Sequence, residues 1–287
     1  MLIRFPEDQG LLYEAFSYPA GESQVRLRDG AISELFKSPE VQVLARNVQE
    51  DFMSLALLAD AIHNLCPFVK STLVLPYLPY SRADRRFQEG DCHGLKVFGE
   101  HLGSLRFSQI KTLDVHSHRA AKLVPNLVNV SARDFVAKAF RDICDNGGHP
   151  AILLPDEGAK GRYALDGVVQ CSKKRDPVTG KLSGFEVPYF ERKDALIVDD
   201  ICDGGGTFTG LAEEINKSHT AWDHTVFADA PKKRLFLYVT HGIFSKGLRE
   251  LSGHFEKIYT TNSIADPAHN KQLKVFDCEP LLLEGPK

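Results

Sequence analysis

The stretch Ala195-Leu-Ile-Val-Asp-Asp-Ile-Cys-Asp-Gly-Gly-Gly-Thr-Phe-Thr-Gly210 decides the fold of this chain. Its apolar run, residues 195–198, predicts a buried strand of a parallel sheet, and the pattern from Phe208 to Lys217 predicts an amphipathic helix. The glycines between them let the backbone approach a ligand closely and leave N–H groups free. Because the start of a helix adds positive partial charge, the loop predicts a phosphate site.

Acidic residues accompany this loop. Asp199 and Asp200 are adjacent at the end of the expected strand, and Asp203 precedes the glycines. Paired carboxylates suit the vicinal hydroxyls of a sugar, directly or through a divalent metal. The loop has no lysine before Thr207, so it is not a Walker A loop. A sugar diol and a phosphate together describe ribose 5-phosphate or its 1-pyrophosphate; the alternative is a purely structural strand-to-helix turn.

Composition limits the classes of protein to consider. A length of 287 residues predicts two domains, and 43% apolar with 25% charged residues is ordinary for a soluble globular protein. The net charge of −3 gives no indication of nucleic-acid binding, and no apolar run reaches the ~18 residues that a membrane helix needs. The six cysteines form no CxxC pair, which indicates free thiols in a reducing compartment and no zinc site. We therefore expect a cytoplasmic protein with neither nucleic acid nor membrane as partner.

Strands and helices alternate along the chain. We expect strands near 72–75, 111–115, 151–154, 195–198 and 234–239, helices at 49–66, 94–105 and 132–145, and only short strands and turns in 1–48. Each strand leads directly into polar residues, and ligands bind at the carboxyl ends of strands in doubly wound sheets. The alternation predicts an α/β fold of two doubly wound parallel-sheet domains with the active site between them.

The glycine loop resembles the phosphoribosyl pyrophosphate (PRPP) binding motif of type I phosphoribosyltransferases and PRPP synthetases. Four further segments resemble those of PRPP synthetases (ribose-phosphate diphosphokinases) in the same order: Pro76 to Arg86, Asp114-Val-His116, Pro155 to Arg162 and Thr240-His-Gly-Ile-Phe-Ser245. The resemblance covers nearly the whole chain. It implies two phosphoribosyltransferase-type domains, 1–131 on the ATP side and 132–271 with the PRPP loop, with 272–287 packing back on the first.

The reaction that this resemblance implies is Mg²⁺-dependent transfer of the pyrophosphoryl group of ATP to the 1-hydroxyl of ribose 5-phosphate, giving PRPP and AMP. It implies catalytic roles for Lys173, Arg175 and His116, and Mg²⁺ ligation by His116 and Asp156. The residues expected to bind ATP are Tyr18, Glu22, Arg82, Lys96 and His116. Those expected to bind ribose 5-phosphate are Asp199, Asp200, Asp203, Gly204, Gly205, Gly206 and Thr207.

Tyr18 and Glu22 match an aromatic residue and an acid that the family uses to hold adenine across a subunit interface, which implies a homodimer or a higher homo-oligomer. Ala20 and Ala83 replace residues that usually form hydrogen bonds near the nucleotide, so the selectivity for the nucleotide donor stays open. Gly90 and His118 replace typical residues around the family's allosteric site, which leaves its regulation open as well.

Two other functions remain as alternatives. A salvage phosphoribosyltransferase, which uses PRPP rather than making it, would explain residues 195–207 but not residues 76–86. A non-catalytic regulatory partner that resembles PRPP synthetase should have lost loop or metal residues, whereas Lys173, Arg175, His116 and Asp156 are all present.

Overall fold

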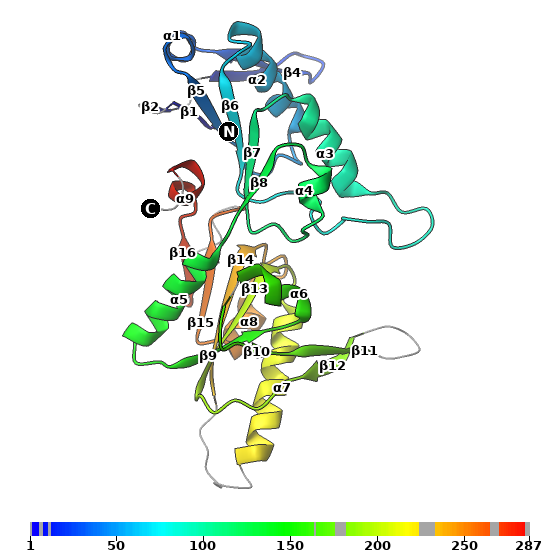
Figure 1. The fold of residues 1–287 in the computed structure, drawn as a ribbon, viewed down its shortest axis with the longest axis vertical. Helices are drawn as coiled ribbons and strands as arrows, with labels where there is room; N and C mark the ends of the chain where they lie inside the picture. Colours follow the sequence, from blue (N-terminus) through cyan, green and yellow to red (C-terminus); the bar gives the residue numbers. More distant parts are fainter. Residues whose placement is uncertain are drawn as a thin grey trace. The chain divides into compact units, whose positions relative to one another are not determined.

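A computed structural model describes residues 2–5, 8–10, 13–163, 165–175, 182–223, 233–264 and 270–284. The chain forms two compact units, each built around a six-stranded sheet (Figure 1). The first unit holds the described residues up to Val130 together with 263–264 and 278–284. The second holds those from Ser131 to Asn262 together with 270–277.

The sheet of the first unit has the order β2-β1-β5-β6-β7-β8, in which β5 to β8 are parallel and β1 and β2 form an antiparallel edge. Its strands are β1 (Leu2–Phe5), β2 (Asp8–Gly10), β5 (Glu40–Leu44), β6 (Lys70–Leu75), β7 (Gln109–Leu113) and β8 (Leu127–Val130), and a separate hairpin pairs β3 (Tyr13–Ser17) with β4 (Ser23–Leu27). Its helices are α1 (Asp29–Lys37), α2 (Phe52–Leu65), α3 (Gly94–Ser104), α4 (Ala120–Leu123) and α9 (Glu279–Glu284).

Helices cover both faces of this sheet. Helices α1, α2 and α3 pack on the face that carries Val41 and Ile110. Side chains alternate between the faces of a strand, so the next residues, Gln42 and Lys111, point to the opposite face. There they donate hydrogen bonds of 3.3 Å to the carbonyls of Leu283 and Leu282 in α9. The C-terminal helix therefore packs on the first unit.

The sheet of the second unit is entirely parallel, in the order β10-β9-β13-β14-β15-β16. Its strands are β9 (Pro150–Leu154), β10 (Val169–Gln170), β13 (Asp194–Cys202), β14 (Arg234–Gly242), β15 (Lys257–Thr261) and β16 (Leu273–Phe276), beside a hairpin of β11 (Ser172–Arg175) and β12 (Leu182–Glu186). Its helices are α5 (Arg133–Asp145), α6 (Glu157–Tyr163), α7 (Gly206–Asp223) and α8 (Arg249–His254). Residues of α7 and α8 join the core on the face of Ile197 and Leu237. On the opposite face the α5 ring of Phe135 stacks on Phe276, so the sheet is doubly wound.

The direction of winding reverses between β9 and β13. After β9 the chain forms β10 on one side of it, and after the β11–β12 hairpin it returns as β13 on the other side (Figure 1). Loops that leave the carboxyl ends of two such strands diverge and leave a crevice. This reversal brings the segment after β9 and the glycine loop after β13 to one edge of the sheet.

Some elements differ from the sequence expectations. The helix expected at 49–66 begins at Phe52, because the Asp51 side chain caps it by accepting from the Ser54 N–H at 3.1 Å. Helix α1 lies in a segment predicted to contain only strands and turns, and that prediction was wrong. It is a nine-residue helix in which only Ala31 and Leu35 are buried. Its sequence therefore has one pair of apolar residues at helical spacing, and this pair is too short a pattern to predict a helix.

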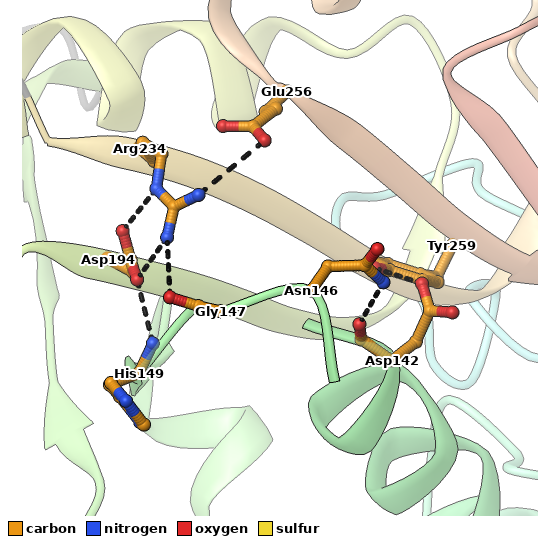
Figure 2. Close-up of polar contacts among 8 residues, drawn as sticks. All are labelled: Asp142, Asn146, Gly147, His149, Asp194, Arg234, Glu256 and Tyr259. Carbon is orange, nitrogen blue, oxygen red and sulfur yellow. Dashed lines mark hydrogen bonds and ion pairs between the residues drawn. The ribbon is translucent and has the colours of Figure 1, made fainter. Parts of the chain in front are cut away.

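Charged residues gather at the amino end of the second sheet (Figure 2). Arg234 donates to both carboxylate oxygens of Asp194, from Nε at 2.7 Å and Nη2 at 2.8 Å, and the His149 N–H donates to the same side chain at 2.7 Å. Asp142 accepts from Lys257 and Lys274, at 2.7 and 2.6 Å. These contacts connect α5 to the strands it covers.

Candidate active site

Asp199 and Asp200 lie within β13, which continues to Cys202 instead of ending at Val198 as the sequence predicted. Asp199 pairs with Val239 and Ile201 with His241, so the neighbouring strand β14 extends the ladder past both acids. The run of apolar residues ends at Val198, and only pairing with a long neighbour keeps the next four residues extended. The acids are therefore held by a sheet and not by a loop.

Arg162, near the end of α6, faces both acids. Its Nη1 contacts Oδ1 of Asp200 and lies 3.8 Å from Oδ1 of Asp199. The backbone N–H of Asp200 donates to Oδ1 of Asp199 at 2.9 Å. The Asp200 side chain is only 4% exposed, whereas that of Asp199 is 15% exposed. Asp200 therefore meets Arg162 inside the protein, and Asp199 is the more accessible of the two carboxylates.

The environment of this pair disfavours a second negative charge. Burial raises the pKa of Asp199 well above its usual range, the negative charge of Asp200 raises it further, and Arg162 acts in the opposite direction. One guanidinium stands against two carboxylates. Hydroxyl donors or a cation would relieve this excess of negative charge, so the pair is suited to a sugar edge or to a metal.

The glycine loop has the geometry of an anion site. Gly205 has φ of +81°, and a Cβ there would lie 3.2 Å from the Leu251 side chain, so no other residue fits well. Helix α7 begins at Gly206. The N–H groups of Gly206 and Thr207 fall in its first turn, where an α-helix offers no internal acceptor and carries positive partial charge. Asp203 accepts from the hydroxyl of Ser245, in the segment after β14, at 2.6 Å.

Lys173 lies on β11 and forms an ion pair with Asp156, the residue that follows β9 and Pro155; the Nζ to Oδ2 distance is 2.7 Å. Strands β11 and β12 form an antiparallel hairpin, in which Arg175 pairs with Leu182 after an irregularity in the ladder. The Arg175 side chain lies outside the described residues. The structure thus brings together two of the expected site residues, Lys173 and Asp156.

The residues expected to bind ATP lie in the first unit. Tyr18 and Glu22 flank the β3–β4 turn, where the Tyr18 N–H donates to the Glu22 carbonyl at 2.8 Å, and both side chains are exposed. Arg82 and His116 are exposed in the segments after β6 and β7. Lys96 is exposed on α3, with its Nζ 3.6 Å from Glu100.

Asp84 organises these segments and was missed by the sequence reasoning. Its carboxylate accepts from Ser117 at 2.7 Å and lies 3.2 Å from Arg85, and its carbonyl is 2.8 Å from Nε2 of His93. Burial opposes ionisation, but the Ser117 hydrogen bond and the nearby cations lower the pKa of Asp84. Asp84 therefore connects the segment after β6 to the loop that carries His116. The only sequence signal was an acid next to arginines after a strand.

Arg162 was also missed. It belongs to the Pro155 to Arg162 segment, but no role was assigned to it. Its contact with Asp200 depends on α6 folding across the end of β13, and the two residues are far apart in the sequence. A local motif could not reveal this pairing.

The expected metal ligands, His116 and Asp156, lie in different units. Within the described ranges, no three His, Cys, Asp or Glu side chains gather in a way that could hold a metal ion. Mg²⁺ is commonly held by one or two carboxylates, with substrate phosphates and water completing its six oxygens. Asp156, whose side chain is 36% exposed, fits such a partial donor set.

Comparisons with known proteins cover most of the chain. It is 26% identical over 273 residues to the ribose-phosphate pyrophosphokinase of Pyrococcus abyssi, which spans 92% of this chain and 87% of that protein. It is 29% identical over 232 residues to that of Saccharolobus solfataricus, or 76% of this chain and 78% of that one. No protein-family model matches the chain. No helix in the described part is long and apolar enough to cross a membrane.

The fold has a counterpart among solved structures. The phosphoribosylpyrophosphate synthetase of Mycobacterium smegmatis superposes with a TM-score of 0.71 at 18% identity, over 95% of this chain and 88% of that chain. Both units therefore have the phosphoribosyltransferase-type fold of that protein. Together with the relatives named above, this fold supports the phosphoribosyl pyrophosphate synthetase family, a family of enzymes, as the family of this chain.

Proposed function

We propose that this protein makes PRPP by transferring the pyrophosphoryl group of ATP to the 1-hydroxyl of ribose 5-phosphate. The sugar oxygen attacks the β-phosphorus and loses its proton. The bond from the β-phosphorus to the oxygen that bridges it to the α-phosphorus breaks, and AMP leaves with that oxygen. Catalysis of such a transfer is mainly positioning and neutralisation of charge.

The extent of the similarity carries this proposal. Relatives named ribose-phosphate pyrophosphokinase match 273 residues, which include both units and not only the unit with the glycine loop. A salvage phosphoribosyltransferase would account for the second unit alone. The Asp84 contacts add support, because they order the arginine-bearing segment and the histidine loop of the first unit, which a transferase would not need.

The glycine loop and the paired acids would hold the sugar phosphate. The loop from Gly204 to Thr207 would surround the 5-phosphate, chiefly through the N–H groups in the first turn of α7, and Asp203, held by Ser245, would keep the loop in place. Asp199 would accept hydrogen bonds from the ribose hydroxyls. Asp200, held by Arg162, would supply the second negative charge of this edge.

The triphosphate would be held by cations. Arg82, Lys96 and His116 would contact ATP. Asp156 and His116 would hold Mg²⁺, which when bound neutralises negative charge on the phosphate oxygens. Lys173 and Arg175 would approach the transferring group, and Lys173 would then exchange its ion pair with Asp156 for one with phosphate. That exchange would convert a resting contact into stabilisation of developing charge.

Tyr18 and Glu22 would hold adenine bound to a neighbouring copy of the chain. Both are exposed at the tip of the β3–β4 hairpin, which forms a two-stranded sheet of its own in the first unit. The working unit would then be at least a homodimer.

The test is AMP formation from ATP in the presence and absence of ribose 5-phosphate, with Mg²⁺ supplied. We expect AMP and PRPP in equal amounts, and neither without the sugar phosphate. A salvage transferase would instead consume PRPP when offered a purine or pyrimidine base. A regulatory partner would form no product from either pair of substrates, and this outcome would reject the proposal.

A further inference from the structure

The segment after β14 braces the glycine loop at consecutive positions. The Ser245 hydroxyl bonds Asp203 at 2.6 Å, and the side chain of Leu251 packs against Gly205. Between them, the stem of Lys246 lies across Gly204. Its Cδ and Cε are each 3.4 Å from the point that a Cβ on Gly204 would occupy. The ammonium group is one bond beyond Cε, so a positive charge is carried beside this loop.

The turn that presents Lys246 is well anchored. The N–H groups of Ile243 and Phe244 both donate to the Cys202 carbonyl, at 2.9 and 3.1 Å, which fixes the turn to the end of β13. The Gly247 N–H closes it on the Phe244 carbonyl at 2.7 Å. Lys246 thus extends from a defined backbone position next to the loop.

Among the described residues, no carboxylate balances the charge on Lys246. Its side chain is exposed, and in the part of the chain that the structure describes no carboxylate lies within 4 Å of its Nζ. The glycine loop contains no cation of its own, and the nearby side chains of Asp199, Asp200 and Asp203 are acidic. A phosphate dianion bound to this loop would accept hydrogen bonds from helix N–H groups, but these carboxylates would repel it.

From this geometry we infer that Lys246 binds the phosphate of the sugar phosphate and selects for a phosphorylated sugar. The inference rests on the function proposed above and deepens it, because it names the residue that supplies a positive charge to the phosphate. The glycine loop itself has no such residue. Lys246 supplies the cation from a separate strand-to-helix connection. An ammonium–phosphate hydrogen bond is of the charge-assisted kind, whose loss lowers affinity by about tenfold or more.

The experiment compares Lys246→Met, which keeps the stem over Gly204 and removes the charge, with Lys246→Arg, which keeps the charge. Lys217→Met is the matched control, because Lys217 is an exposed lysine far along α7 from its first turn. Each variant is assayed for kcat and for the KM of ribose 5-phosphate and of ATP. Binding of ribose 5-phosphate is measured separately by calorimetry, and thermal unfolding reports on the fold.

We expect Lys246→Met to raise the KM and the Kd of ribose 5-phosphate by about tenfold, with the KM of ATP and kcat within twofold of wild type. Lys246→Arg should recover most of the loss, and Lys217→Met should resemble wild type. An unchanged Kd for Lys246→Met, or an equal rise in the KM of ATP, would overturn the inference. If wild type itself binds no ribose 5-phosphate, the proposed function fails, and the inference fails with it.

Discussion

The two ends of the second sheet carry the same residue type in opposite electrostatic settings. At the amino end, Asp142 receives hydrogen bonds from two lysines and from Tyr259. Asp194 receives two hydrogen bonds from Arg234 (Figure 2). At the carboxyl end, Asp199 and Asp200 share Arg162. At the amino end each of these aspartates thus has at least one cationic partner. At the carboxyl end two aspartates share a single arginine.

The pKa directions follow this difference. At the amino end burial opposes ionisation, but the hydrogen bonds from Lys257, Lys274 and Tyr259 lower the pKa of Asp142 to about 2. At the carboxyl end burial and the charge of Asp200 raise the pKa of Asp199. A lowered carboxyl pKa adds stability at neutral pH, and a raised one removes it. The amino end therefore stabilises the fold, whereas the carboxyl end keeps unfavourable charge that a ligand can relieve.

The largest expected effect tests whether the carboxyl end is catalytic. Lys173→Ala should lower kcat by at least ~100-fold, because in the proposed reaction Lys173 supplies a cation to the transferring pyrophosphoryl group. The KM values of both substrates and the melting temperature should stay close to wild type. Steady-state kinetics of AMP release measure this, with Lys193→Ala, an exposed lysine just before β13, as control. A higher KM with unchanged kcat would mean that Lys173 only binds substrate.

The next effect tests the amino end. Asp142→Asn should lower the free energy of unfolding by about 2 kcal/mol at pH 7, since Lys257 and Lys274 lose the charged acceptor of their hydrogen bonds. Because this network lies away from the glycine loop, kcat should not change. Denaturant unfolding measures the loss, and Asp145→Asn, on the same helix with an exposed side chain, is the control. A variant as stable as wild type would show that these ion pairs contribute no net stability.

The same stabilisation should depend on pH. The pKa of Asp142 is about 2 in the folded protein, and an unfolded aspartate titrates near ~3.9. The contribution of Asp142 is therefore fully present above about pH 4 and is lost as the pH falls towards 2. The difference in melting temperature between wild type and Asp142→Asn should shrink over this window. A constant difference down to pH 2 would contradict the lowered pKa.

The smallest effect comes from the same change, aspartate to asparagine, at the carboxyl end of the sheet. There it should raise the stability of the fold, whereas at Asp142 it lowers it. The pKa of the Asp199 carboxyl is raised in the folded protein, so ionisation of this group lowers the stability of wild type as the pH rises above ~4. The Asp199→Asn variant has no such group and keeps that stability. We expect a gain of roughly 1 kcal/mol at pH 7, together with weaker binding of ribose 5-phosphate. Thermal unfolding and calorimetry of the same sample measure both. Lower stability combined with normal binding would remove Asp199 from the sugar site.

The sequence predicted the parallel strands and most of the helices well. The continuous apolar run 195–198 is buried on both faces, and its burial is visible in the residues themselves, whereas in the run 151–154 only Leu153 and Leu154 are fully buried. The ends of the elements were less predictable. Strand β13 continues for four residues past Val198 because β14 pairs with it, and no local pattern encodes the length of a neighbouring strand.

The candidate site divides in the same way. The sequence by itself determined the fold class, the glycine loop and the acids around it, because each depends on residues close together in the chain. Only the tertiary structure decided that Asp200 is buried against Arg162, that Lys173 rests on Asp156, and that Lys246 lies over Gly204. These partners come from elements and loops that are separate in the sequence. The winding of the sheet brings them to one edge, and distance in space sets the strength of a charge interaction.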